Sequence, residues 1–162
     1  MCGIAGIMYK GQNDAPTGQA LINMLDGCQH RGPDSTGFAL YDPAANGQLR
    51  LRFFIGQGQE AEEALTRIRA ELQNQNAPIV DDEVIGTSYR VTVNFKGDLK
   101  SFAYEIEHAA KVISIGSSLD IIKDVGSAYD VDQTYDVHRF RGTHGLGHVR
   151  LATESDVKPE AA

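Results

Sequence analysis

The second residue of the chain is a cysteine, in the stretch MCGIAGI, and small or apolar residues follow it. Removal of Met1 would leave Cys2 with a free α-amine, and such amines, with a pKa of about 7.7–8.0, are partly neutral near pH 7. A neutral amine beside a thiol can act as the general base that produces the attacking thiolate. The alternative is a cysteine in a frayed chain end, and MC alone favours this alternative.

Two further stretches carry charged side chains that suit such a nucleophile. In HRGPDSTGF, a Gly-Pro pair places Arg31 and Asp34 on a tight turn, from which a guanidinium can point into a cleft. In GHVRLAT, Arg150 stands among Val, Leu and Ala on a predicted strand, so it needs an anionic partner. A substrate carboxylate, bound through two parallel hydrogen bonds, and an internal ion pair both satisfy this need.

Metal and phosphate sites have weaker support in the sequence. Gly145 and Gly147 argue against a helix between His144 and His148. In an extended strand, residues four apart lie about 13 Å from each other, which is too far for two ligands of one ion. The chain has no C-x-x-C or H-E-x-x-H pattern, and IGSSLDIIKDVG lacks the G-K-[ST] of a phosphate loop. We therefore expect neither a metal nor a cofactor.

Composition limits the class of protein. The chain has 162 residues, 41% of them hydrophobic and 23% charged, which predicts one globular domain, with or without a modest insertion. Its net charge of -7 argues against nucleic-acid binding. No apolar run reaches the roughly 20 residues of a membrane span, and no export signal is evident. We expect a cytoplasmic protein in which Cys2 and Cys28 are free thiols.

The periodicity predicts an α+β protein. Strands are expected near 1–9, 36–42, 49–55, 88–95 and 111–116, and apolar alternation supports those at 49–55 and 88–95. Helical spacing predicts helices near 17–28, 61–72 and 98–106. Ser118 and Gly126 are expected to begin and end another short helix. Residues 142–155 are expected to form a Gly-rich turn that leads into a strand. The middle of the chain, 48–126, is interpreted as an inserted α+β segment.

Taken in order, MCGIAGI, HRGPDSTGF and GHVRLATES resemble the motifs of class II glutamine amidotransferases, which are N-terminal-nucleophile hydrolases. The resemblance is closest to the amidotransferase subunit or domain of glutamate and N-methylglutamate synthases. It covers both ends of the chain well and the middle loosely. It implies that 1–162 is the N-terminal part of such a domain, with a four-layer αββα sandwich built on two antiparallel sheets.

The resemblance also implies roles for single residues. Cys2 would be the nucleophile and its α-amine the base, while Arg150 would bind the α-carboxylate of L-glutamine. Thr153 and the backbone of Ala152 would lie beside that carboxylate, and Arg31 would support the closed site. Attack on the side-chain amide would release ammonia for a partner synthase subunit or domain, and hydrolysis of the thioester would free glutamate.

The family carries its oxyanion-hole Asn and Gly in a segment that would follow Ala162. Three interpretations stay open: a fragment, a split domain that a second polypeptide completes, or a degenerate copy. The alternative function is a non-catalytic scaffold or regulatory subunit that keeps the amidotransferase fold. A ligand-binding role for 48–126 is a third hypothesis, without a diagnostic motif.

Overall fold

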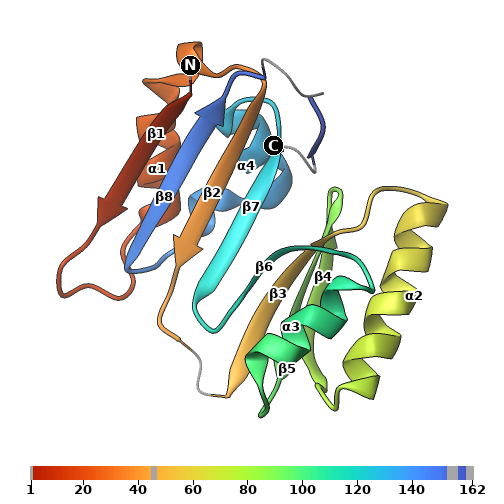
Figure 1. Ribbon diagram of the computed structural model, residues 1–162. Helices are drawn as coiled ribbons and strands as arrows, with labels where there is room; N and C mark the ends of the chain where they lie inside the picture. Colours follow the sequence, from red (N-terminus) through yellow and green to blue (C-terminus); the bar gives the residue numbers. More distant parts are fainter. Residues whose placement is uncertain (1, 45–46, 153–156, 160–162) are drawn as a thin grey trace. The chain divides into compact units, whose positions relative to one another are not determined.

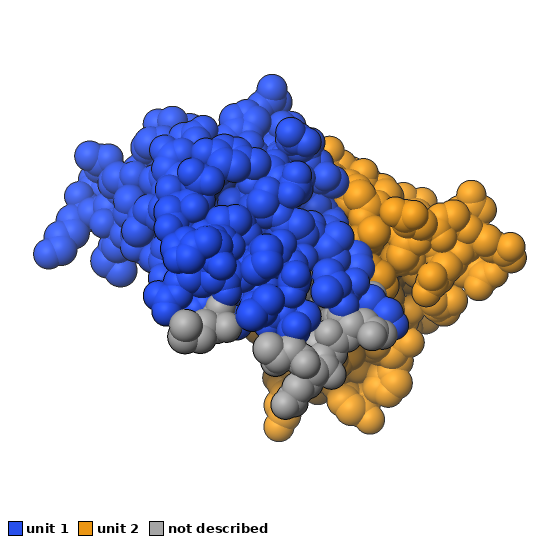
Figure 2. Space-filling view, turned by 90° about the horizontal axis from the view of Figure 1, so that it is seen from above, with its two compact units in different colours: residues 1–43, 121–162 blue, residues 44–120 orange. Residues whose placement is uncertain are grey.

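The computed structural model describes residues 2–44, 47–152 and 157–159. The chain divides into two compact units, which Figure 2 colours separately. The first comprises 1–43 and 121–162, and the second comprises 44–120. The second unit overlaps the expected insertion 48–126 but ends earlier, because 121–125 belong to a strand of the first unit's sheet.

The first unit is built on an antiparallel sheet whose strand order is β1-β8-β2-β7 (Figure 1). Its strands are β1 (Gly3–Met8), β2 (Ser35–Tyr41), β7 (Leu119–Val125), whose first two residues belong to the second unit, and β8 (His144–Arg150). Its helices are α1 (Thr17–Asp26), α4 (Ala128–Tyr135) and the 3₁₀ turns η1 (Gln29–Arg31) and η2 (Val137–Arg139). Helices α1 and α4 pack on the same face of the sheet (Figure 1).

Glycines let α1 approach the centre of this sheet. A Cβ on Gly147 would lie 2.7 Å from Leu25 Cδ1, and one on Gly145 would lie 2.8 Å from Leu21 Cδ1. Both leucines are fully buried. The expected Gly-rich turn is therefore wrong at these positions: the glycines lie inside β8, where they make room for the helix.

The second unit is another antiparallel sheet, of order β4-β5-β3-β6, covered by two helices. Its elements are β3 (Gln48–Phe54), α2 (Gln59–Asn74), β4 (Ile79–Ile85), β5 (Ser88–Asn94), α3 (Leu99–Glu107) and β6 (Lys111–Gly116). Apolar side chains of the sheet and of the two helices form one core between them. This core includes Phe53 and Tyr89 from the strands and Ile68 and Phe102 from the helices. Asp98 caps α3 by accepting a hydrogen bond from the Ser101 N–H, as the sequence predicts.

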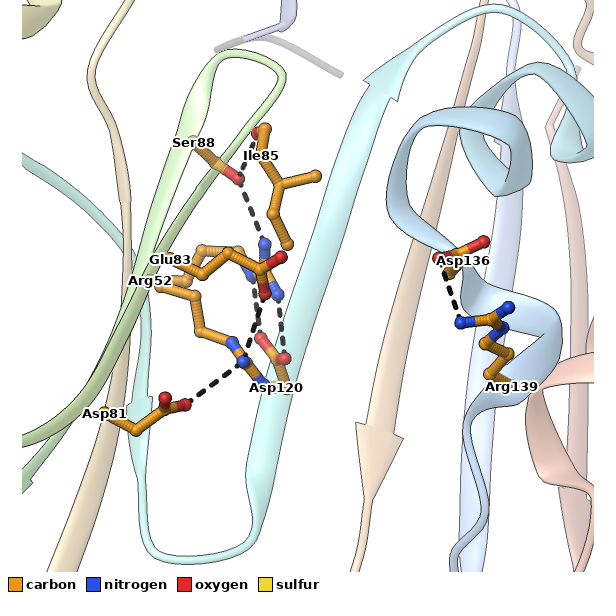
Figure 3. Close-up of polar contacts among 9 residues, drawn as sticks. Arg52, Asp81, Glu83, Ile85, Ser88, Asp120, Asp136 and Arg139 are labelled. Carbon is orange, nitrogen blue, oxygen red and sulfur yellow. Dashed lines mark hydrogen bonds and ion pairs between the residues drawn. The ribbon is translucent and has the colours of Figure 1, made fainter.

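Arginines on the other face of this second sheet pair with acids, one of which, Asp120, comes from the start of β7. Arg52 forms a two-hydrogen-bond ion pair with Asp120, at 2.8 and 2.9 Å, and their side chains are only 2% and 8% exposed (Figure 3). Burial alone would raise the pKa of Asp120, but the Arg52 hydrogen bonds and charge outweigh burial and hold that pKa below its ordinary value. Arg90 pairs with Asp81 and Glu83 beside them.

One predicted helix is also wrong, and one strand was not predicted. The helix expected from Ser118 to Gly126 is the strand β7, because the isoleucines there extend the first sheet beside β2. The next helix begins at Ala128 instead, after Ser127, whose hydroxyl forms a capping box with Asp130. Strand β4 was not predicted, because its acidic, exposed sequence IVDDEVI lacks apolar alternation.

Among the described residues, no helix combines the length and apolarity of a membrane span.

Candidate active site

A hollow of about 540 Å³ lies on the face of the first sheet that α1 and α4 leave uncovered. Its polar side chains come from Cys2, Lys123, His148 and Arg150. The rest of its lining is apolar or glycine, and it includes Ile4, Gly37 and Leu146. A thiol therefore shares a largely apolar hollow with two cationic side chains and an imidazole.

Strand register explains why Cys2 and Arg150 meet. Strands β1 and β8 are antiparallel, with Gly3 opposite Val149 and Ile4 opposite His148. Continued by one residue, this register sets Cys2 opposite Arg150. Directly opposite residues of an antiparallel pair project from the same face. The structure thus brings together the two residues that the sequence placed at the centre of the predicted site.

His148 and Lys123 line the hollow but were not predicted as site residues. The imidazole lies over Gly37, where a Cβ would come within 2.6 Å of Nε2. Burial lowers the pKa of His148 below its ordinary 6.5, and the nearby charges of Lys123 and Arg150 lower it further. The ring is therefore neutral near pH 7. The alternation of His148 with Arg150 on one strand face was the available signal, whereas Lys123 was hidden by the wrong helix assignment of 118–126.

The RGPD turn packs directly on the end of β8. A Cβ on Gly32 would collide with the Val149–Arg150 peptide, within 2.6 Å of three main-chain atoms. The Asp34 N–H donates to the Arg150 carbonyl at 3.1 Å, and the Asp34 carboxylate accepts from the Ala152 N–H at 2.7 Å. The turn therefore holds the strand end that carries Arg150.

The remaining predicted site residues differ in their placement. Arg31 ends η1 with an exposed side chain and does not line the hollow. The Ala152 N–H is engaged by Asp34, so a substrate carboxylate would have to compete for it. Thr153 lies outside the described residues.

The second thiol lies on the other side of β1. Cys28 follows α1, and its Sγ would be 2.9 Å from a Cβ placed on Gly3. Because residues alternate between faces along a strand, Gly3 faces the helix side and Cys2 faces the hollow. Cys2 is exposed, whereas Cys28 is half-buried and its thiol contacts the Met24 carbonyl at 3.7 Å. Within the described ranges, no group of three or more His, Cys, Asp or Glu could hold a metal ion.

Comparisons with known proteins support an amidotransferase family. The chain is 35% identical over 169 residues to a Methanothermobacter thermautotrophicus protein named "Putative glutamine amidotransferase", with 97% of this chain aligned to 54% of that protein. It is 31% identical over 159 residues to the glutamine amidotransferase-like protein GlxB of Rhizobium meliloti, at 97% and 52% coverage. The chain spans about half the length of the curated relatives it matches. No protein-family model matches it.

Proposed function

We propose that the chain carries the N-terminal part of a class II glutamine amidotransferase domain of the N-terminal-nucleophile type, related to the amidotransferase subunits of glutamate and N-methylglutamate synthases. The observation that carries the proposal is that Cys2 and Arg150, from opposite ends of the chain, line one hollow on one sheet face. The names of the relatives support the same activity.

In this proposal Arg150 binds the α-carboxylate of L-glutamine through paired hydrogen bonds. The side-chain amide of glutamine then extends toward Cys2, which lies opposite Arg150 in the β1–β8 strand pair. Lys123, from β7, lines the same hollow and adds a second positive charge to it. His148 is neutral near pH 7, so it adds no further charge next to the α-ammonium of the substrate.

The chemical steps follow from a processed amino terminus. After removal of Met1, the α-amine of Cys2 takes the thiol proton, and the thiolate attacks the amide carbon of glutamine. The carbon–nitrogen bond breaks, and the departing nitrogen takes the proton back from the α-ammonium. Ammonia is released, and a γ-glutamyl thioester remains on Cys2. The amine then takes a proton from a water molecule, and the resulting hydroxide attacks the thioester carbon. The carbon–sulfur bond breaks, the departing sulfur takes the proton back from the α-ammonium, and glutamate and the Cys2 thiol are released. The ammonia passes to a synthase subunit or domain.

The uncovered sheet face supports the proposed αββα sandwich. Ile4, Met8 and Leu146 project from this face and are 79%, 69% and 52% exposed. Contiguous exposed apolar side chains on one face mark a surface that packs against another layer. We propose that a second sheet packs here, and that the segment following GHVRLATES supplies the oxyanion hole.

Glutamate release from L-glutamine tests the proposal, measured on the protein purified as its native assembly. We expect Cys2→Ala to lower the rate by more than about 10⁴-fold, as loss of a nucleophile does. Cys28→Ala is the matched control, because its thiol lies on the helix side of β1, and it should keep the wild-type rate.

Mass spectrometry of the same preparation should show a chain that begins at Cys2. Full retention of Met1, with no turnover in any complex, would contradict the catalytic assignment. Calorimetric binding of glutamine without turnover would instead favour the scaffold alternative.

A further inference from the structure

We propose that Asp34 is a positioning residue for glutamine: it fixes the end of β8 and thereby aims the Arg150 guanidinium at the substrate carboxylate. This inference rests on the proposed function. It gives the RGPD turn a different task from the one that the sequence suggested, since the acid of the turn, rather than Arg31, acts on the site.

Arg150 needs such support because of its place in the fold. It is the last residue of β8, and β1 begins only at Gly3, so the regular ladder ends beside it. An arginine side chain has several rotatable bonds, and its direction depends on the main chain that carries it. A strand end without further contacts would let that main chain fray.

Asp34 holds the strand end on both sides of Leu151. Its N–H donates to the Arg150 carbonyl at 3.1 Å, and its carboxylate accepts from the Ala152 N–H at 2.7 Å. The second bond is charge-assisted, so it is stronger than a neutral amide–carbonyl bond. One residue therefore fixes the peptides that precede and follow Leu151.

Asp34 is itself anchored from elements outside β8. The Gly126 N–H donates to the Asp34 carbonyl at 2.9 Å, where β7 leads into α4. The Gln29 side chain donates to the Gly32 carbonyl at 2.8 Å and accepts from the Ala128 N–H at 3.0 Å. The turn is therefore hydrogen-bonded both to the β7–α4 junction and to the strand end that carries Arg150.

Close packing leaves this turn little freedom. A Cβ on Gly32 would meet Val149 C at 2.4 Å and Arg150 N at 2.5 Å, so the turn lies directly against the β8 main chain. Backbone atoms cannot move aside as a side-chain tip can. The turn is therefore held in a fixed position against the strand. A fixed strand end keeps a substrate-binding guanidinium in one orientation.

The test compares two substrates in the native assembly. One is L-glutamine, and the other is L-glutamine α-amide, which keeps the reacting side chain but lacks the α-carboxylate. Asp34→Ala should raise KM for glutamine about tenfold, the loss expected for a charge-assisted hydrogen bond, with a smaller change in kcat. The α-amide should respond by less than about twofold, because Arg150 has no carboxylate to bind in it.

Two further variants keep the test decisive. Asp34→Asn keeps an oxygen acceptor without the charge, so it should fold if Asp34→Ala does not and should raise KM for glutamine about threefold. The matched control is Asp98→Ala, which also removes a carboxylate that accepts a main-chain N–H, at the start of α3 in the second unit. It should leave KM for both substrates unchanged.

The outcomes separate the two proposals. An unchanged KM for glutamine in both Asp34 variants, or an equal change for both substrates, would overturn the positioning role while wild-type turnover and an inactive Cys2→Ala upheld the proposed function. Absence of both turnover and glutamine binding in the wild type would overturn the two together.

Discussion

The two units share one plan and differ in the sheet face that their helices leave uncovered. Each has an antiparallel sheet with two helices on one side. In the first unit the opposite face carries a thiol, an imidazole and two cations around an apolar hollow. In the second unit it carries arginines that are matched by acids, such as Arg52 with Asp120. The first face is suited to bind a ligand, and the second is neutralised internally.

The helix-covered faces differ as well. In the first unit β8 presents Gly145 and Gly147 to α1, whereas in the second unit β5 presents Tyr89 and Val91 to the helices. Glycines bring the helix close to the sheet, and large side chains fill a wider layer. A sheet can thus be held rigidly by helices on one side while its other side stays available for chemistry.

The largest effect on stability is expected at the buried ion pair of the second unit. Asp120→Ala would leave Arg52 buried without its carboxylate, which should lower the free energy of unfolding by about 3–5 kcal/mol. Urea denaturation, followed by circular dichroism, measures the change. The exposed pair of Arg139 with Asp136, at 3.7 Å in the first unit, provides the control (Figure 3). Arg139→Ala should change stability by less than about 1 kcal/mol.

Equal effects of the two substitutions would remove the distinction between a neutralised and an open face. A double variant sharpens the test. Arg52→Met with Asp120→Leu should recover most of the lost stability, because apolar residues can replace a buried ion pair.

A smaller effect is expected where glycine admits α1. Gly147→Ala places a methyl group 2.7 Å from the Leu25 side chain, which should destabilise the protein by about 1–3 kcal/mol. Gly27→Ala is the matched control in the same unit, because Gly27 has helical φ and its nearest contact is at 3.4 Å. Thermal unfolding of both variants measures the difference. A tolerated Gly147→Ala would show that the close helix approach is not required.

The smallest effect concerns His148 and pH. Its pKa in the folded state lies below 6.5, the ordinary value that we take for the unfolded state. At pH values between these two pKa values, the unfolded chain therefore binds more protons than the folded chain. The free energy of unfolding should therefore fall as the pH drops below about 6.5 and level off below the folded-state pKa. His148→Gln should flatten this dependence, as measured by urea denaturation between about pH 5 and pH 7.5. An unchanged slope would contradict the burial of a neutral imidazole.

Much of the second unit could be predicted from the sequence because its core follows regular periods. Leu51 and Phe53 alternate along β3, and Ile68 and Leu72 recur along α2. Strand β4 escaped prediction because an exposed edge strand carries acids where a central strand carries apolar residues. Register and edge position are long-range properties that local patterns do not encode.

The candidate site was predictable in part. Cys2 and Arg150 stood out by residue type, and the structure brings them to one hollow. Lys123 and the clamp of Asp34 on Ala152 depend on where β7 and the RGPD turn pack, so no local pattern contained them. The glycines of β8 were visible, but their purpose required the position of α1. The catalytic roles themselves stay predictions.

Covalent labelling tests the central claim most directly, namely that the Cys2 thiol attacks a substrate that Arg150 orients. An electrophilic glutamine analogue, with a chloroketone in place of the side-chain amide, is incubated with the native assembly, and peptides are mapped by mass spectrometry. We expect one adduct, on an amino-terminal Cys2, that excess L-glutamine prevents and that Arg150→Met slows at least about tenfold. Labelling of Cys28 at the same rate, or an adduct on Cys2 that is indifferent to glutamine and to Arg150, would contradict the account.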